Sequence, residues 1–195
     1  MILPLFRRGS HNRNIHVLYG MIVTQARAAV FYTGYGVPDT VQGQFELIVL
    51  HLVLLLSRLG GENEPGSGRS GNRSPARSLA RTLGQQLFDV FCRDLDDNLR
   101  EMRVGDLAVP REMRRFGEAF YGRQAAYRAA LAAADERELE NALARNIFGV
   151  VGVDDRAARL ARYARAVAKQ LDTEKEDALA AGKTVFPSPE AFVHA

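Results

Sequence analysis

Apolar residues recur at three- and four-residue steps along most of this chain, and the pattern is clearest between residues 86 and 131. Each half of the stretch lays its apolar side chains on one face of a helix: Leu87, Val90, Phe91, Leu95, Leu99 and Met102, then Met113, Phe116, Phe120, Tyr127 and Leu131. Between the halves, Gly105 tolerates the positive φ of a helix end, and Pro110 can open a new helix. The stretch therefore predicts a helical hairpin.

Two further helices are predicted before this hairpin. Asn14 is an N-cap candidate for an amphipathic helix that runs to about Tyr32. Asp39 followed by Gln42 predicts a capping box for a second helix, from Thr40 to Leu59. This second helix carries the most apolar run of the chain, FELIVLHLVLLL, which is interrupted by a histidine. A helix that spans a bilayer needs about 20 predominantly apolar residues, so we expect this run to be too short. We expect it at the centre of a bundle or under a partner's apolar surface.

Two shorter helices are predicted after the hairpin. Asp135 begins the sequence D-E-R-E, a capping box for a helix that Gly149 closes. Asp154 or Asp155 begins the next helix, with Leu160, Tyr163, Val167 and Leu171 inside and Arg156, Arg159, Arg162 and Arg165 mostly outside. We interpret this arginine row as a solvated helix face rather than a nucleic-acid stripe. After Gly182, the segment TVFPSPEAF is expected to be extended.

Length and composition favour one all-α domain. The chain has 195 residues, 47% of them apolar, which is enough for one sizeable core. Residues 60–77 read GGENEPGSGRSGNRSPAR and predict a mobile loop, because glycine, serine, asparagine and proline dominate there. We expect a basic flexible N-terminus (1–14), a helical domain (15–182) that contains this loop, and an extended C-terminal tail (183–195). The domain is predicted to be a bundle of about six to seven helices with a central hairpin.

The excess of positive charge lies at the N-terminus. The formal net charge is +3, yet no acidic residue precedes Asp39, whereas Arg7, Arg8 and Arg13 lie in the first 14 residues. These three arginines are candidates for contact with an anionic surface, either lipid headgroups or ribosomal RNA. The single cysteine, Cys92, cannot form an internal disulfide, which suits a reducing compartment.

Candidate chemistry is scarce. The acidic string Asp89, Asp94, Asp96 and Asp97 could bind a divalent cation, but a calcium loop from Asp94 would need glycine and glutamate where Leu99 and Gly105 stand. The sequence has no Glu-x-x-His pairs for a di-iron centre, no glycine-rich phosphate loop and no G-x-S-x-G elbow. We therefore expect no enzyme activity, no metal and no cofactor.

The hairpin charges have a structural interpretation. If the hairpin closes, four acidic residues lie within reach of five arginines and can set its angle: Asp94, Asp96, Glu101 and Asp106, with Arg93, Arg100, Arg103, Arg111 and Arg123. Tyr121 and Tyr127 can add hydroxyl hydrogen bonds. His51 can be a ligand, a proton carrier or a core histidine bonded to a backbone carbonyl, and we favour the last because no second histidine or acidic cluster is near in sequence.

Two blocks of the chain carry a family resemblance: LYGMIVTQARAAVFYTGYGVPDTVQGQFELIVLHLVLLLSRL and FDVFCRDLDDNLREMRVGDLAVPREMRRFGEAFYGRQAAY. With the spacing of QAR, VPDT, FELIVLH, DLDDNLREM, VGDLAVP and AFYGR, the chain from Ile15 to Phe186 resembles the ubiquinol-cytochrome c chaperone family. The family includes a mitochondrial assembly factor of the cytochrome bc1 complex and α-proteobacterial relatives. Gln44 stands where arginine is usual, and Arg103 where glycine is usual. With no mitochondrial targeting region, the chain looks like a bacterial member.

The resemblance implies a helper protein that holds newly made cytochrome b, or another bc1 subunit, until assembly. It implies cytoplasmic localisation, with peripheral contact to the cytoplasmic face of the inner membrane, and ribosome or small co-chaperone partners but no DNA. We place the binding groove between the helix Thr40–Leu59 and the hairpin. The candidate partner-binding residues are His51, Asp94, Asp96, Arg100, Glu101, Asp106, Phe116, Phe120, Tyr121, Arg123 and Tyr127. The alternative is a membrane-surface or RNA-binding adaptor with mainly electrostatic contacts.

Overall fold

The fold is all helical over the residues that the computed structural model describes, which are 5–60, 75–102, 105–175, 178–179 and 181–193. Side chains are described from residue 14 onward and, at the start of α4, from residue 78. The elements are α1 (Leu5–Ala26), α2 (Ala29–Thr33), α3 (Val41–Gly60), α4 (Pro75–Glu101), α5 (Val109–Ala132), α6 (Arg137–Leu143), the π-turn η1 (Ala144–Phe148), α7 (Asp155–Thr173) and the 3-10 turn η2 (Pro189–Phe192). The predicted all-α bundle is confirmed.

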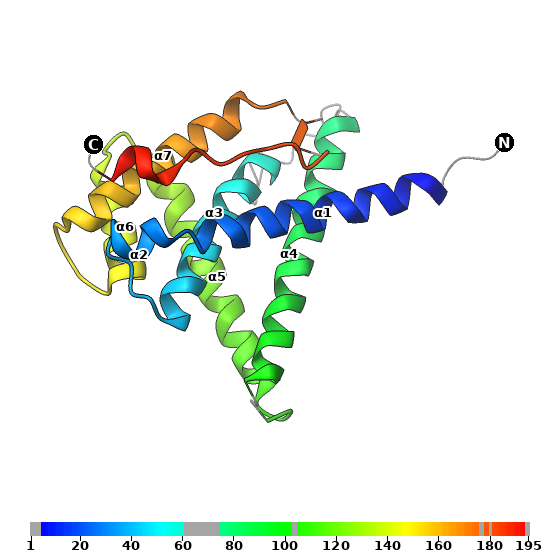
Figure 1. Ribbon diagram of the computed structural model, residues 1–195, viewed down its shortest axis with the longest axis horizontal. Coiled ribbons are helices and arrows are strands. Elements are labelled where there is room, and N and C mark those ends of the chain that lie inside the picture. Colours follow the sequence, from blue (N-terminus) through cyan, green and yellow to red (C-terminus); the bar gives the residue numbers. More distant parts are fainter. Residues whose placement is uncertain (1–4, 61–74, 103–104, 176–177, 180, 194–195) are drawn as a thin grey trace.

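Helix α3 lies at the centre of the bundle and packs against α1, α4, α5 and α7 (Figure 1). Of its residues from Leu47 to Leu55, all except Ile48 are buried. Its 20 residues are apolar enough to cross a membrane by length and composition, so the expectation that it is too short was wrong. However, 67% of this stretch is buried inside the protein, which is the environment of a core helix.

The N-terminal helix differs from its prediction at both ends. It begins at Leu5 rather than at Asn14, because no proline after Pro4 interrupts the segment, and residues 5–14 are helical. It ends at Ala26, where the chain bends through the extended residue Ala28 into α2. The bend carries Phe31 into the core, where its side chain is fully buried. Burial of this ring favours two helices over the single one predicted.

The start of α3 is capped by a residue other than the predicted one. The hydroxyl of Thr40 accepts the backbone N–H of Gly43 at 3.1 Å, so the predicted capping box of Asp39 and Gln42 was wrong. Gln42 instead donates to the Glu46 carboxylate. A side chain at Gly43 would place its Cβ 2.0 Å from the carbonyl oxygen of Pro38, so only glycine fits this close approach.

Helices α4 and α5 form the predicted hairpin, and they converge on a narrow apex that projects from the body (Figure 1). Helix α4 begins at Pro75, and Pro110 lies in the first turn of α5, as predicted. Gly105 does not adopt a positive φ, so that prediction was wrong. Its carbonyl oxygen instead accepts the N–H groups of Ala108 and Val109, which closes the turn in a right-handed conformation. Most of the predicted mobile loop, residues 61–74, lies outside the described residues.

The two C-terminal helices follow the sequence closely. Gly149 ends η1 with φ +67°, and Asp154 is the N-cap of α7. The Asp154 carboxylate accepts the N–H groups of Arg156 and Ala157 at 2.8 and 3.3 Å. Its ion pair with the Arg156 guanidinium, together with these backbone donors, lowers the pKa of Asp154.

Replacing Asp154 by alanine is expected to lower the free energy of unfolding by about 1 kcal/mol, because two N–H groups of α7 lose their acceptor. Urea denaturation followed by circular dichroism measures this change. Asp155→Ala is the matched control, since its exposed carboxylate lies in the first turn of the same helix. An equal loss of stability in both variants would show that the N-cap hydrogen bonds of Asp154 do not account for the change.

The C-terminal segment packs against the body and does not form a free extended tail. Phe186 is 5% exposed and its ring lies 5.1 Å from that of His51. The Tyr35 hydroxyl donates to the carbonyl oxygen of Pro189 at 2.7 Å, and η2 follows at once. The segment is extended only up to Ser188, because apolar contacts and backbone acceptors hold it on the bundle.

Candidate partner-binding groove

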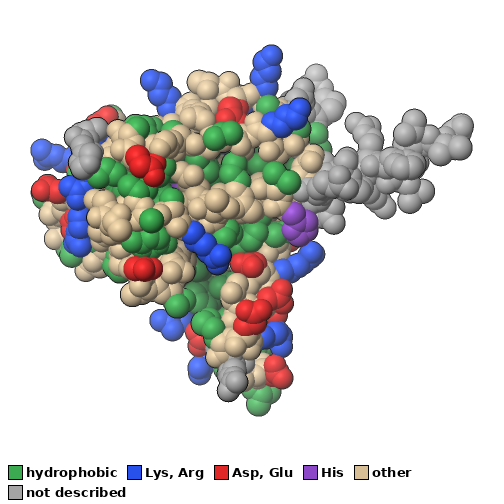
Figure 2. Space-filling model, in the orientation of Figure 1, with side chains coloured by type: hydrophobic (Ala, Val, Ile, Leu, Met, Phe, Trp, Pro, Cys, Tyr) green, Lys and Arg blue, Asp and Glu red, His purple; other side chains and the backbone are tan. Residues whose placement is uncertain are grey.

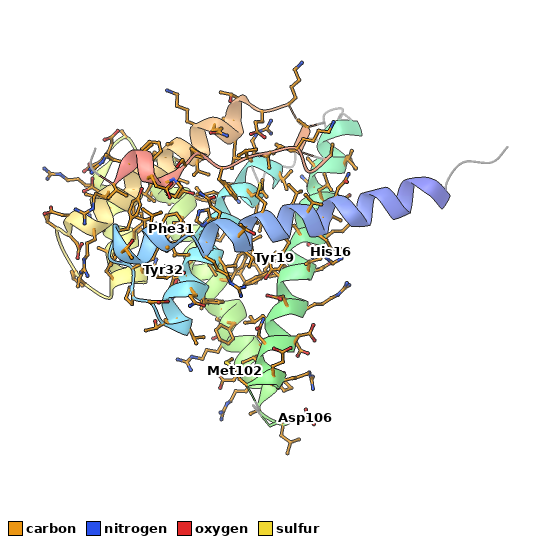
Figure 3. All side chains as sticks on the ribbon, viewed as in Figure 1. His16, Tyr19, Phe31, Tyr32, Met102 and Asp106 are labelled. Carbon is orange, nitrogen blue, oxygen red and sulfur yellow. The ribbon has the colours of Figure 1, made fainter. Side chains whose placement is uncertain are left out.

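The hairpin charges pair only in part as expected. Arg100 contacts Asp96 at 2.8 Å and Asp106 at 3.0 Å, which joins α4 to the apex. Asp94 instead accepts the hydroxyl of Tyr19 at 2.7 Å, so it ties α4 to α1 (Figure 3). Glu101 is exposed, and Arg103 lies outside the described residues.

Acidic and basic side chains are interspersed along the hairpin in Figure 2. Asp106 and Met102 lie at its apex in Figure 3. The charged groups there are open to solvent, since the side chains of Arg100 and Asp106 are 51% and 89% exposed. Exposed ion pairs of this kind contribute little to stability. The apex also carries Leu107, which is 99% exposed.

The most buried ion pair of the hairpin joins the candidate residue Arg123 to Glu46, which was not among its predicted partners. Arg123 on α5 makes a two-pronged contact with Glu46 on α3, with both N···O distances at 2.5 Å. Glu46 is 1% exposed, and it also accepts from Gln42. Glu46 is the one carboxylate between Thr40 and Leu59, and an isolated charge inside an apolar run signals a buried partner. The pair fixes α5 against the central helix.

His51 is a core residue. Its Nδ1 lies 2.7 Å from the carbonyl oxygen of Leu47, which can only accept, so Nδ1 carries the proton. Its Nε2 then accepts the hydroxyl of Tyr163 at 2.8 Å, and that hydroxyl accepts the side-chain amide of Gln25. Burial lowers the pKa of His51 to about 4. The structure thus supports the interpretation as a core histidine, and the fully buried ring offers no surface to a partner.

Aromatic rings fill much of the space between α3 and the hairpin. Phe45 on α3 lies 4.9 Å from Phe116, and Phe88 lies 4.8 Å from Phe120, between ring centroids. Phe120 is 1% exposed, whereas Phe116 is half-buried. Phe116 and Phe120 therefore serve mainly to pack the helices together. The groove expected between α3 and the hairpin is closed along the N-terminal half of α3.

Further along α3 the space is open. A hollow of about 200 Å³ lies between α3, α4 and α5, lined by Leu56, Gly60, Arg81, Gly84, Gln85, Phe88, Phe120, Tyr121, Gln124 and Arg128. A second hollow of about 260 Å³ lies between α3, α5 and α7, lined by Leu54, Ser57, Arg58, Arg128, Leu131, Ala132, Ala168 and Asp172. Because both share Arg128, we call them together the α5 groove. Its lining mixes apolar side chains, such as Leu56 and Phe88, with polar ones, and its rim carries the exposed residues Arg81 and Tyr121.

The two candidate tyrosines occupy different environments. Tyr121 is 59% exposed and lies on the rim of the α5 groove. Tyr127 is fully buried, and burial together with the charge of Glu46 raises the pKa of its hydroxyl. Only Tyr121 is available to a partner. Of the other candidates, the side chains of Arg7, Arg8 and Arg13 lie outside the described part of the chain.

Among the described residues, no group of three His, Cys, Asp or Glu side chains is placed to hold a metal ion. Asp94 and Asp96, which the sequence analysis weighed as cation ligands, are engaged by Tyr19 and Arg100.

The fold and the groove define an all-α helical bundle with an open hollow on its surface. A groove of this kind can accommodate a helical or extended segment of another protein. Residues 33–186 match the family ubiquinol-cytochrome C chaperone, and the chain belongs to this family. A search of curated proteins gives no match. The crystal structure of the Cbp3 homolog from Brucella abortus is similar, with a TM-score of 0.83 and 36% sequence identity, over 98% of this chain and 99% of that one.

Proposed function

We propose that this chain is an assembly chaperone for ubiquinol-cytochrome c reductase, and that it binds newly made cytochrome b. The observation that carries the proposal is the family match over residues 33–186, supported by the similarity to the Cbp3 homolog across nearly the whole of both chains. A chaperone acts by binding and release, so this function requires a surface that is open to a partner rather than a reactive centre.

The α5 groove is the surface that suits this function best. Leu56 and Phe88 provide apolar surface in the groove, and burial of apolar area from a client stabilises the complex by roughly 25 cal/mol per Å². Tyr121 stands on the rim, and tyrosine is among the side chains that contribute most to binding at protein interfaces. A client segment that is apolar on one face could thus be shielded from water while it waits for its partner subunits.

Replacing Tyr121 by aspartate is expected to reduce capture of newly made cytochrome b about tenfold, because a truncated aromatic anchor and a buried charge both weaken binding. The measurement is chemical crosslinking during synthesis of cytochrome b in cells that lack the native chain and express the variant. The variant should fold, since Tyr121 is 59% exposed. Aspartate at Phe120 would be a poor test, because that ring is 1% exposed and its loss would unfold the protein.

Leu107→Asp is the matched control. It makes the same kind of change at an exposed apolar residue, but at the hairpin apex rather than in the groove. Equal capture by wild type and Tyr121→Asp would contradict the groove assignment. Normal accumulation of the reductase in cells without the chain would contradict the proposed function itself.

We further propose that the protein works in the cytoplasm, at the inner face of the membrane that receives its client. The acid-free N-terminal segment, with Arg7, Arg8 and Arg13, supports this location. An adaptor that relied on these arginines alone would lose binding steeply with added salt, whereas capture through the α5 groove should persist at high salt.

A further inference from the structure

We infer that the α5 groove selects a helix that carries acidic residues beside its apolar anchors. This inference rests on the proposed function, in that it specifies the chemistry of the client segment. The observation behind this inference is the charge of the first hollow, where Arg81 and Arg128 stand among glutamines and apolar residues, and no acidic residue is among the described residues that line the wall.

Both arginines are without a carboxylate partner among the residues that the structure describes. Neither Arg81 nor Arg128 forms an ion pair with a residue that the structure describes. The paired arginines Arg123 and Arg156 differ, since each has a carboxylate partner within the fold. A guanidinium group with five donors and no acceptor is best satisfied by a carboxylate, which it can contact through two hydrogen bonds. An acidic partner therefore complements the rim.

The second hollow extends the site and carries less positive charge than the first. Arg58 donates to the carbonyl oxygens of Leu171 and Glu174, so it closes the C-terminal end of α7 and stays in place as part of the wall. Asp172 is the one acidic lining residue among those described there, at the far end of the groove from Arg81. The groove therefore becomes less cationic from α4 toward α7.

The shape of the groove fits a helix. The α5 residues that line the two hollows run from Phe120 to Ala132, which corresponds to about 18 Å or some three helical turns. A helix of that length presents apolar anchors at positions i, i+3 or i+4, and i+7 along one face. Beside the groove, α5 exposes Gly122 and Ala125, and a Cβ at Gly122 would meet no atom within 4 Å. A second helix can approach α5 closely there.

The test uses two synthetic 18-residue amphipathic helical peptides with identical leucine positions, one flanked by glutamates and one by lysines. Each carries a fluorophore, and binding to the full-length protein is followed by fluorescence anisotropy at about 0.1 M salt. The expected result is at least a tenfold tighter binding of the glutamate peptide. The double variant Arg81→Glu/Arg128→Glu should lose or reverse this preference.

The matched control is Arg111→Glu/Arg114→Glu, which changes the same charge on exposed residues of α5 near the apex. This control should keep the preference for the glutamate peptide. Three results would overturn the inference: equal affinity for both peptides, a preference for lysine, or a loss of preference in the control alone. Circular dichroism of each variant confirms that the helical fold is retained.

Two other occupants give distinct results. If the groove serves a second copy of the chain, light scattering will show a dimer that the Arg81→Glu/Arg128→Glu variant dissociates. If it serves lipid, that variant will lose binding to anionic phosphatidylglycerol vesicles while it keeps the peptide preference. Either result overturns the inference. If the wild-type protein shows no preference between the two peptides but still crosslinks to cytochrome b, the charge selection is rejected and the proposed function stands.

Discussion

Arg123→Ala is expected to lower the free energy of unfolding by about 3–5 kcal/mol, because it leaves the Glu46 carboxylate buried without its partner. Glu46 is 1% exposed and accepts two N–H groups from Arg123, one on each carboxylate oxygen. For a domain of this size the loss corresponds to a fall in Tm of roughly 6–20 °C. Urea denaturation and thermal unfolding measure it directly.

The matched control for this prediction is Arg100→Ala. Arg100 also makes two contacts with carboxylates, but its side chain is 51% exposed, so its loss should change stability little. A second comparison is the double variant Glu46→Leu/Arg123→Leu, which removes both charges and should be markedly more stable than Arg123→Ala alone. If Arg123→Ala and Arg100→Ala unfold at the same urea concentration, the buried pair does not hold α5 against α3.

Stability is expected to fall as the pH is lowered from 7 to 5, and His51 is expected to account for about 2 kcal/mol of the fall. The folded protein holds the pKa of His51 near 4, below its ordinary value of 6.5, because the ring is fully buried. The unfolded chain therefore takes up more protons than the folded one as the pH falls. The contribution is constant above pH 7 and decreases as the pH drops below 6.5.

A series of urea denaturation curves between pH 5 and 7 tests this expectation. In His51→Gln the pH dependence over this range should be much smaller, whatever its stability at pH 7. His16→Gln is the control, since this histidine lies on the exposed face of α1 and should leave the pH dependence unchanged. A wild-type slope that survives in His51→Gln would assign the pH dependence to other groups.

Protonation of His51 is expected to weaken contacts of other side chains as well, because its ring belongs to a chain of hydrogen bonds. Protonation turns Nε2 from an acceptor into a donor, so the Tyr163 hydroxyl can no longer donate to the ring. The Tyr163 hydroxyl also accepts from Gln25, which in turn donates to the carbonyl oxygen of Pro187. The C-terminal segment is therefore connected to α3 through one chain of hydrogen bonds.

Helices and their approximate ends could be read from the sequence because they depend on local properties. Proline at position 110, glycine at 149 and aspartate at 154 act on their own backbone or that of the next few residues, and each lies where it was predicted to act. The 3.6-residue period of apolar residues likewise identified the inner face of α7, including Tyr163 and Leu171.

Two of the wrong predictions, the single N-terminal helix and the free C-terminal tail, depend on contacts that are distant in sequence. The bend between α1 and α2 serves the burial of Phe31, and the C-terminal segment is folded back by acceptors for Tyr35 and Gln25. Local propensity contains no information on either contact, since the partners are more than 100 residues apart for both hydrogen bonds.

In the candidate site, too, some residues could be identified from the sequence, whereas their partners and burial depend on distant contacts. Tyr121 and the hairpin could be identified from the sequence, but Arg123 was assigned to the acidic string of α4, whereas its partner is Glu46, 77 residues away. Phe120 and Tyr127 were placed on a binding face and lie in the core. Arg81 and Arg128 attracted no notice, since each is one arginine among many until α4 and α5 bring them to one hollow.

The sequence by itself determined the helices, the central position of α3 and the resemblance to the ubiquinol-cytochrome c chaperones, because period, caps and motif spacing are properties of neighbouring residues. Only the tertiary structure decided which charges are buried in pairs, which aromatic rings fill the core and where a groove remains open. Those outcomes depend on how whole helices pack, since a side chain's solvent exposure and its partners are set by elements far away along the chain.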